Sequence, residues 1–285
     1  MKTRHWILTF LVLVGLMACQ RNRRNFEQAE TLFQQGVEQR AAKQSEAAAE
    51  SFNEALLAIE HCDLDKPETK HLKAQIEDNL GFTYWKHELF EEALPLHTDA
   101  TTLARELGDS TLLMTTLRNS GRAAASLNDI NAAQQYYDEA LSLAKALNDK
   151  TMEADILLES SRDVLMVKED YRQVITRVNQ ALAESATPDI CHLILGAAHY
   201  YLEQDSLALV HLNEATKSET AGTRMSAYQS LYYLYLFAEN YPKALECHEL
   251  FNENMMQADR EHRSEQVQRI KAEYDLQMQI GRPHV

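Results

Sequence analysis

The chain has 285 residues, of which eight are glycine, five are proline and 45% are hydrophobic, and its formal net charge is −15. The scarcity of helix-breaking residues and of alternating β-branched runs favours a mostly helical protein and disfavours a sheet. The apolar content is ample for a core, and the acidic balance disfavours nucleic acid as a partner.

The first expected element is a short apolar segment, Trp6 to Ala18, which follows the basic residues Lys2 and Arg4. Its thirteen residues are too few to cross a bilayer of roughly 30 Å. A basic start followed by such a segment is typical of a secretory signal. We therefore expect a signal peptide over residues 1–18.

The signal segment ends in Leu16-Met17-Ala18-Cys19, which resembles the lipobox of bacterial lipoproteins. The resemblance implies cleavage before Cys19, lipidation of that cysteine and a basic tether over residues 19–25. Met17 departs from the small residue that is usual at its position. A plain signal peptide that leaves Cys19 as a free thiol is the alternative.

The lipobox-like end also implies a cellular location. It places the chain in a bacterial cell envelope, lipid-anchored to a membrane and facing the periplasm. Gln20 stands where an aspartate would favour retention in the inner membrane, so we expect the outer membrane.

Four glycines after the signal segment share one pattern. Each is followed by an alanine twelve residues later and by a second alanine after seven more. The glycines with their first alanines are Gly36 and Ala48, Gly81 and Ala93, Gly121 and Ala133, and Gly196 and Ala208. Two weaker copies, around Val174 and Ala244, bring the total to six. A recurring unit of this length predicts stacked helix-turn-helix repeats.

Within the second copy, Leu80, Gly81 and Tyr84 together with Ala93 and Ala100 resemble the signature of the tetratricopeptide repeat (TPR). The resemblance implies an all-α, right-handed solenoid of about six repeats over residues 26–255. Each repeat would consist of a helix A and a helix B, and the small residues would let these two helices approach each other closely.

Parts of the chain depart from the regular pattern. The fourth repeat needs one extra residue before Val174, so we expect irregular packing from Ser161 to Val178. Pro95 falls beyond the first turn of a helix B, where it should remove a hydrogen bond and bend the helix. Residues 256–285 are expected to form an amphipathic helix that caps the last repeat, followed by a tail.

The TPR resemblance also implies a concave groove, lined by the A helices, that binds a protein or peptide. At groove positions of the second and third repeats stand Asp78, Asn79, Phe82, Trp85, Arg118, Asn119 and Arg122. The two arginines lie at i and i+4 and can present both guanidinium groups to one carboxylate. Pairing with acidic residues of the repeats, such as Asp78 or Glu159, is the alternative.

A second candidate surface is aromatic and comprises Tyr200, Tyr201 and Tyr233. Tyrosines in an open groove favour contact with a peptide or a sugar. The alternative is that these rings belong to the core, as most such stripes do.

No motif of a catalytic or metal-binding site occurs in the sequence, such as GxSxG, HExxH or a phosphate-binding glycine loop. His and Cys are neighbours at residues 61–62, 191–192 and 247–248. Adjacent side chains point about 100° apart on a helix, so each pair is a poor chelator. We therefore expect a protein that is not an enzyme and uses no metal or cofactor.

The favoured function is a lipid-anchored TPR scaffold that binds a protein or peptide partner. One alternative is the sensor part of a signalling or transcriptional regulator that lacks its membrane helix and DNA-binding output, because residues 266–277 resemble the start of a linker in such sensors. A second alternative is an accessory lipoprotein for glycan or nutrient uptake. The sequence leaves the oligomeric state open.

Overall fold

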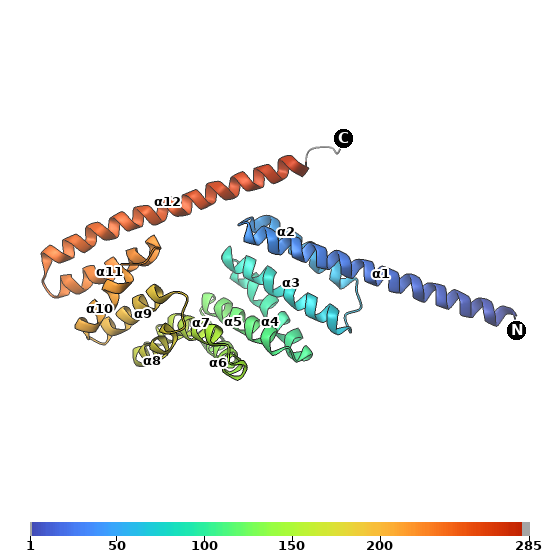
Figure 1. Cartoon of the computed structure of the whole chain (residues 1–285), viewed down its shortest axis with the longest axis horizontal. Helices are drawn as coiled ribbons and strands as arrows, with labels where there is room; N and C mark the ends of the chain where they lie inside the picture. Colours follow the sequence, from blue (N-terminus) through green and yellow to red (C-terminus); the bar gives the residue numbers. More distant parts are fainter. Residues whose placement is uncertain (1, 281–285) are drawn as a thin grey trace. The chain divides into compact units, whose positions relative to one another are not determined.

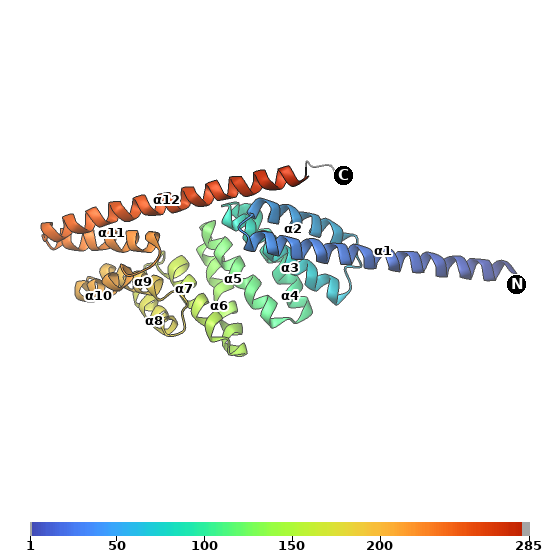
Figure 2. The same ribbon diagram turned by 45° about the horizontal axis from the view of Figure 1, so that its top comes forward.

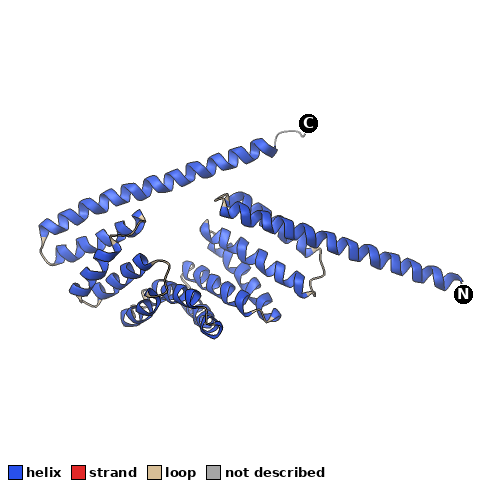
Figure 3. Ribbon diagram, in the orientation of Figure 1, coloured by secondary structure: helices blue, strands red, loops and turns tan. Residues whose placement is uncertain are grey.

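The structure, a computed structural model, describes the backbone of residues 2–280 and the side chains of residues 20–261. Within the described backbone every regular element is a helix (Figures 1 and 3). The elements in chain order are α1 (Lys2–Ala41), α2 (Ser45–Glu60), α3 (Pro67–Lys86), α4 (Phe90–Leu107), α5 (Ser110–Ser126), α6 (Ile130–Leu147), α7 (Lys150–Ser160), η1 (Ser161–Leu165), α8 (Tyr171–Leu182), α9 (Pro188–Tyr201), α10 (Asp205–Ala215), α11 (Ala221–Phe237) and α12 (Tyr241–Ile280).

The chain divides into two compact units, an N-terminal unit (Met1–Ala123) and a C-terminal unit (Ala124–Val285). In the N-terminal unit α1 packs on α2 and α3 packs on α4. In the C-terminal unit α9 packs on α10 and α11 on α12. These antiparallel pairs, visible in Figure 2, are the helices A and B of the expected repeats. The prediction of an all-α, TPR-like solenoid is confirmed.

The turns between helices A and B share one backbone conformation. In every repeat, the second residue before helix B is a non-glycine residue with φ between 56° and 62°. These residues are Lys43, Glu88, Asn128, Glu169, Glu203 and Glu239. L-residues adopt this left-handed region at a cost. Its recurrence at the same position shows that all six repeats, including the two weak ones, keep one register.

The repeat glycines pack against the large residue that follows sixteen positions later. A Cβ on Gly36 would lie 2.6 Å from the Phe52 ring, and one on Gly196 would lie 2.6 Å from Leu212. A Cβ on Gly81 would lie 3.0 Å from the His97 ring, which fills the space beside this glycine. The expected packing residues are all buried: Gly36, Ala48, Gly81, Ala93, Gly121, Ala133, Gly196, Ala208 and Ala244.

The irregular fourth repeat contains a π-helix. Residues Ser161–Leu165 form η1 directly after α7, with the Met166 amide donating to the Ser161 carbonyl at 3.0 Å. A π-helical turn accommodates one residue more than an α-helical turn. The insertion thereby keeps Val174 and Val178 in the core despite the extra residue. The expectation of irregular packing in this stretch is confirmed.

Several helix ends have residues that favour starting or ending a helix. Gly108 ends α4 with φ of 67°, and the Asp109 side chain accepts a hydrogen bond from the Leu112 amide at 3.0 Å. Pro188 begins α9. Pro95 lies inside α4, which continues through it as one helix. The bend expected at Pro95 stays a prediction.

The two long helices extend beyond the repeats. α12 runs from helix B of the sixth repeat into the C-terminal segment with no break at residue 255, so the expected capping helix is its continuation. The backbone of the signal segment belongs to α1, but its side chains and that of Cys19 lie outside the described residues. Among the helices that the structure describes, none is both long and apolar enough to cross a membrane.

Candidate binding surfaces

Two aromatic rings of α3 lie on the face where the groove was predicted. Phe82 and Trp85 are three residues apart, one helical turn, and their ring centroids are 6.0 Å apart with an interplanar angle of 30°. Both side chains are half-buried. The N-terminal unit thus presents an aromatic platform that is partly accessible to solvent.

Three cationic side chains from three helices surround this platform. Arg122 of α5 places Cζ 4.8 Å from the Trp85 centroid and 5.7 Å from the Phe82 centroid. Lys86 Nζ lies 5.5 Å from the Trp85 ring, and Arg40 Cζ of α1 lies 5.4 Å from the Phe82 ring. Cation–π contacts of this kind contribute about 0.5–2 kcal/mol each, more where water is excluded. We call these five residues the cation–aromatic cluster.

Arg40 was not among the predicted site residues. Burial lowers the pKa of its guanidinium, and the negative charge of Asp78 acts in the opposite direction. The repeat register contained the signal for it, because Arg40 follows Gly36 by four residues as Trp85 follows Gly81. Equivalent positions of neighbouring A helices meet at the same surface, so the first repeat also contributes to this site.

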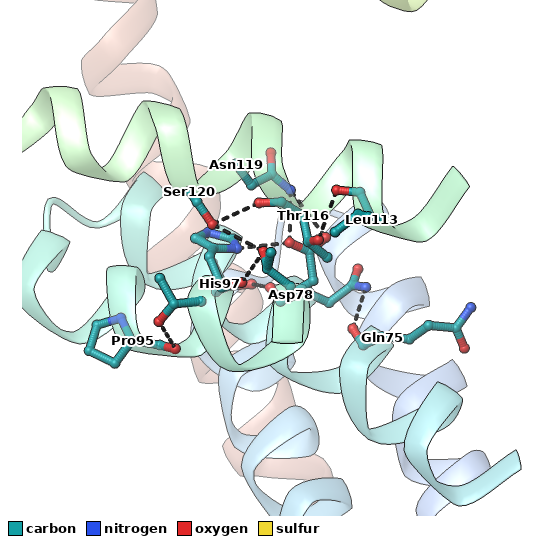
Figure 4. Close-up of polar contacts among 12 residues, drawn as sticks. Gln75, Asp78, Pro95, His97, Leu113, Thr116, Asn119 and Ser120 are labelled. Carbon is teal, nitrogen blue, oxygen red and sulfur yellow. Dashed lines mark hydrogen bonds and ion pairs between the residues drawn. The ribbon is translucent and has the colours of Figure 1, made fainter. Parts of the chain in front are cut away.

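Two predicted groove residues lie inside the N-terminal unit instead. Asp78 and Asn119 are only 7% and 9% exposed. Asn119 Nδ2 donates to both carboxylate oxygens of Asp78, at 3.0 and 3.1 Å (Figure 4). His97 Nδ1 lies 2.8 Å from Asp78 Oδ1. An ionised carboxylate only accepts hydrogen bonds, so Nδ1 is the donor. We call Asp78, His97 and Asn119 the buried triad.

Hydroxyl groups extend this polar interior along α4 and α5. Thr101 Oγ1 and Ser120 Oγ are 3.4 Å apart. Ser120 Oγ donates to the Thr116 carbonyl at 2.9 Å (Figure 4). Each hydroxyl is buried and hydrogen-bonded, which is the condition for polar atoms inside a core. The triad and these hydroxyls tie α3, α4 and α5 together beneath the cation–aromatic cluster.

The remaining predicted residues of this surface are half-buried. Asn79 donates through Nδ2 to the Gln75 carbonyl at 2.7 Å, and Arg118 lies on α5, one turn before Arg122. The structure therefore brings Phe82, Trp85 and Arg122 together at one surface. Asp78 and Asn119 support that surface from below.

The aromatic residues of the C-terminal unit are divided between surface and core. Tyr201 is 56% exposed and stacks on Tyr171 with centroids 4.8 Å apart and planes at 9°. Tyr233 is also exposed, whereas Tyr200 is half-buried and packs against the core around Leu212. The prediction missed Tyr171, because that ring comes from the start of α8, a helix B. The exposed Tyr201 ring, stacked on the half-buried Tyr171 ring, forms a small second candidate surface.

Three histidines cluster between α9 and α10. His192 Nδ1 and His211 Nδ1 are 2.9 Å apart, and the rings of His199 and His211 are parallel with centroids 5.4 Å apart. Burial lowers the pKa of His211, and the positive charges that His192 and His199 would carry lower it further. Among the described side chains, no group of three or more His, Cys, Asp and Glu is arranged to hold a metal ion.

The three cysteines of the repeats are free thiols, with Cys191 and Cys247 buried and Cys62 half-buried. Burial raises the pKa of each thiol. Raised thiol pKa values reduce the thiolate fraction and hence reactivity, as in structural cysteines.

Comparison with known proteins matches two of the repeats to a family model. Residues 72–146 match the tetratricopeptide repeat family model, a stretch that covers most of the second and third repeats. Among curated proteins, none matches the sequence.

Solved structures with similar folds include BtubC from P. vanneervenii, at 16% identity and a TM-score of 0.63 over 75% of this chain and 92% of that one. RapI has a TM-score of 0.64 at 12% identity over 83% of this chain and 66% of that one. A Rap protein complexed with Competence and Sporulation Factor has a TM-score of 0.57 at 14% identity, covering 81% and 66%. At these identities the likeness concerns the fold.

Proposed function

We propose that this chain, in which residues 72–146 match the tetratricopeptide repeat family model, is a non-catalytic scaffold that binds a protein or peptide segment through the cation–aromatic cluster. The proposal includes a lipid anchor at Cys19 and a location on the periplasmic side of a bacterial envelope.

The cation–aromatic cluster carries the proposal. Three cations and two rings from α1, α3 and α5 converge on one partly exposed surface. A guanidinium group can bind a carboxylate through two parallel hydrogen bonds, and the rings offer a flat apolar contact. An acidic or aromatic side chain of a partner matches this chemistry. Tryptophan and arginine, both present in the cluster, are among the residue types that contribute most to the binding energy of protein interfaces.

The buried triad favours a rigid site. Arg122 and the Trp85 ring sit on helices whose mutual position is fixed by Asp78 and Asn119, with two hydrogen bonds between α3 and α5. A surface held in its binding geometry before the partner arrives loses less conformational entropy on binding. The polar interior thereby supports the function without contacting the partner.

Proteins of similar fold give further support. One is a Rap protein crystallised in complex with Competence and Sporulation Factor, and another is YrrB, described as a TPR protein with an unusual peptide-binding site. Their binding is a property of those proteins, and it makes a peptide or protein partner the natural first candidate here.

Crosslinking in intact cells followed by affinity capture tests the binding proposal. Trp85→Ala and Arg122→Glu should each reduce the captured partner at least about tenfold, the effect of losing roughly 1.4 kcal/mol of binding free energy. Lys145→Glu on the exposed face of α6 is the matched control, since it makes the same charge change outside the cluster. Circular dichroism of each variant checks the fold. Undiminished capture by folded Trp85→Ala and Arg122→Glu proteins would remove the cluster as the site.

The anchor requires its own experiment. Cells fed a radioactive fatty acid should label the wild-type protein and leave Cys19→Ala unlabelled. Equal labelling of both proteins would refute the anchor while leaving the binding proposal intact. Fractionation of the labelled membranes then distinguishes the outer membrane from the inner one.

A further inference from the structure

An open cleft of about 450 Å³ lies in the N-terminal unit, between α1, the start of α3 and the connection from α4 to α5. Its position is distinct from the cation–aromatic cluster, with which it shares no residue. It is lined by Phe26, Glu30, Pro67, Glu68, His71, Leu72, Gln75, Leu107 and Asp109.

The cleft combines apolar side chains with acidic ones. Phe26, Leu72 and Leu107 supply apolar surface, while Glu30 and Glu68 are exposed acids of α1 and α3. Asp109 Oδ2 lies 3.4 Å from His71 Nδ1, which adds a fixed carboxylate to the same lining. Lysine and arginine bury their aliphatic stems on apolar surface and place their charge at a polar edge. The cleft is therefore complementary to a basic side chain.

The repeat register places the cleft and the cluster on one face. On α1, Phe26 of the cleft precedes Arg40 of the cluster by fourteen residues, and on α3 Glu68 of the cleft precedes Phe82 of the cluster by the same number. Residues seven or fourteen apart lie on the same helix face, and fourteen residues rise roughly 21 Å. The two sites therefore stand at opposite ends of the same pair of A helices, with opposite charge.

We propose that the N-terminal unit binds an extended partner segment of mixed charge, with an acidic side chain on the cation–aromatic cluster and a basic side chain in the acidic cleft. An extended chain advances about 3.3 Å per residue, so a span of roughly 21 Å separates the two side chains by about six residues. The inference rests on the proposed function and adds to it the charge pattern of the partner. Two sites of opposite sign also fix the direction in which the segment lies.

Calorimetric titration with synthetic peptides tests the pattern. The main probe is a serine-rich peptide with capped ends that carries one arginine and one glutamate about six residues apart. Companion peptides replace the arginine by glutamine, replace the glutamate by glutamine, or halve the spacing. The full-length protein should bind the main probe at least about tenfold more tightly than any companion, the gain expected from one charge-assisted contact.

Protein variants assign the arginine to the cleft. The double variant Glu30→Gln/Glu68→Gln should lose the preference for the arginine-bearing peptide and keep its affinity for the arginine-free one. Glu91→Gln/Glu92→Gln on the exposed first turn of α4 makes the same charge change outside the cleft, so it should keep the preference. An equal loss in this control would show bulk attraction to an acidic protein and overturn the cleft assignment.

The outcomes separate the two proposals. One outcome is that the arginine does not change the affinity while Trp85→Ala still weakens the binding of every glutamate-bearing peptide. In that case the proposal for the cleft fails and the proposal for the cation–aromatic cluster stands. If no peptide of the series binds at millimolar concentration while cellular capture still depends on Trp85, the mixed-charge pattern is wrong and the scaffold function stands. If capture is also independent of Trp85, both proposals fail.

Discussion

Asn119 on α5 donates two hydrogen bonds to one carboxylate on α3, that of Asp78, which also accepts a hydrogen bond from His97 on α4. One acid thus connects three consecutive helices and both kinds of contact in a repeat array, within a repeat and between repeats. Its two partners are buried with it in the N-terminal unit, where water cannot replace a lost contact.

Removing the acid should therefore destabilise the N-terminal unit. Asp78→Ala leaves the His97 and Asn119 donors buried without an acceptor, at a cost of about 1–3 kcal/mol for each unsatisfied group. Asn119→Ala, which removes one donor and leaves Asp78 with His97, should cost less. Urea denaturation followed by circular dichroism measures both. A double variant that costs as much as the two single ones added together would show that the side chains are not coupled.

Glu77 should make stability depend on pH. Its side chain is 3% exposed, one carboxylate oxygen lies 3.5 Å from Lys73 Nζ, and the other is buried with no hydrogen-bond partner among the described side chains. Burial raises the pKa of Glu77 to about 7, and the negative charges of Asp99 and Glu60 add to the rise, while Lys73 opposes it.

A raised pKa means that the folded state binds the proton more tightly than the unfolded state. The contribution of Glu77 to the free energy of unfolding is fully present below its unfolded pKa of about 4.5 and is lost as the pH rises through about 7. The loss is at most on the order of 3 kcal/mol. Glu77→Gln should therefore be more stable than the wild type at about pH 8 and equal to it at about pH 4. Exposed Glu92→Gln serves as the control, with parallel curves expected. The same gain from Glu77→Gln at both pH values would contradict the assignment.

The repeat glycines should not tolerate larger residues. Gly81→Leu places a side chain where the His97 ring lies 3.0 Å from the Cβ position, so it must displace the ring that hydrogen-bonds to Asp78. Overpacking of this kind costs about 1–3 kcal/mol. Gly222, whose Cβ would meet nothing within 4 Å, is the matched control, and Gly222→Ala should be harmless. Thermal melts that leave Gly81→Leu unchanged would refute the packing role.

The repeat architecture could be predicted from the sequence because the small residues that it requires recur at regular spacing. Gly36, Gly81 and Gly196 recur with alanines at fixed distances, and the structure places each against the large residue of helix B. The extra residue in the fourth repeat was also visible from spacing alone. Its physical solution, the π-helical turn η1, depends on local backbone geometry that spacing does not specify.

The binding surface was less predictable, because its composition depends on which polar side chains form hydrogen bonds in the protein interior and so leave the surface. Asp78 and Asn119 occupy groove positions by register, yet they are buried because each satisfies the other. Arg40 was missed because its role comes from a ring on a different helix, Phe82 of α3. Contacts between repeats determine both the burial of Asp78 and Asn119 and the position of Arg40. A repeat pattern in the sequence describes only the contacts within a single repeat.

The left-handed residues of the A–B turns offer a route to a more stable protein. Glu88 has φ of 62° and an exposed side chain, so glycine would adopt its conformation with no steric cost and would remove no buried contact. Relief of the strain, roughly 1–2 kcal/mol, exceeds the extra backbone entropy that glycine loses on folding, so Glu88→Gly should gain about 0.5–1 kcal/mol. Glu91→Gly, three residues later in the first turn of α4, should instead lose about 0.5–1 kcal/mol. Denaturant melts of both variants test the sign, and a loss of stability in Glu88→Gly would show that the turn is not strained.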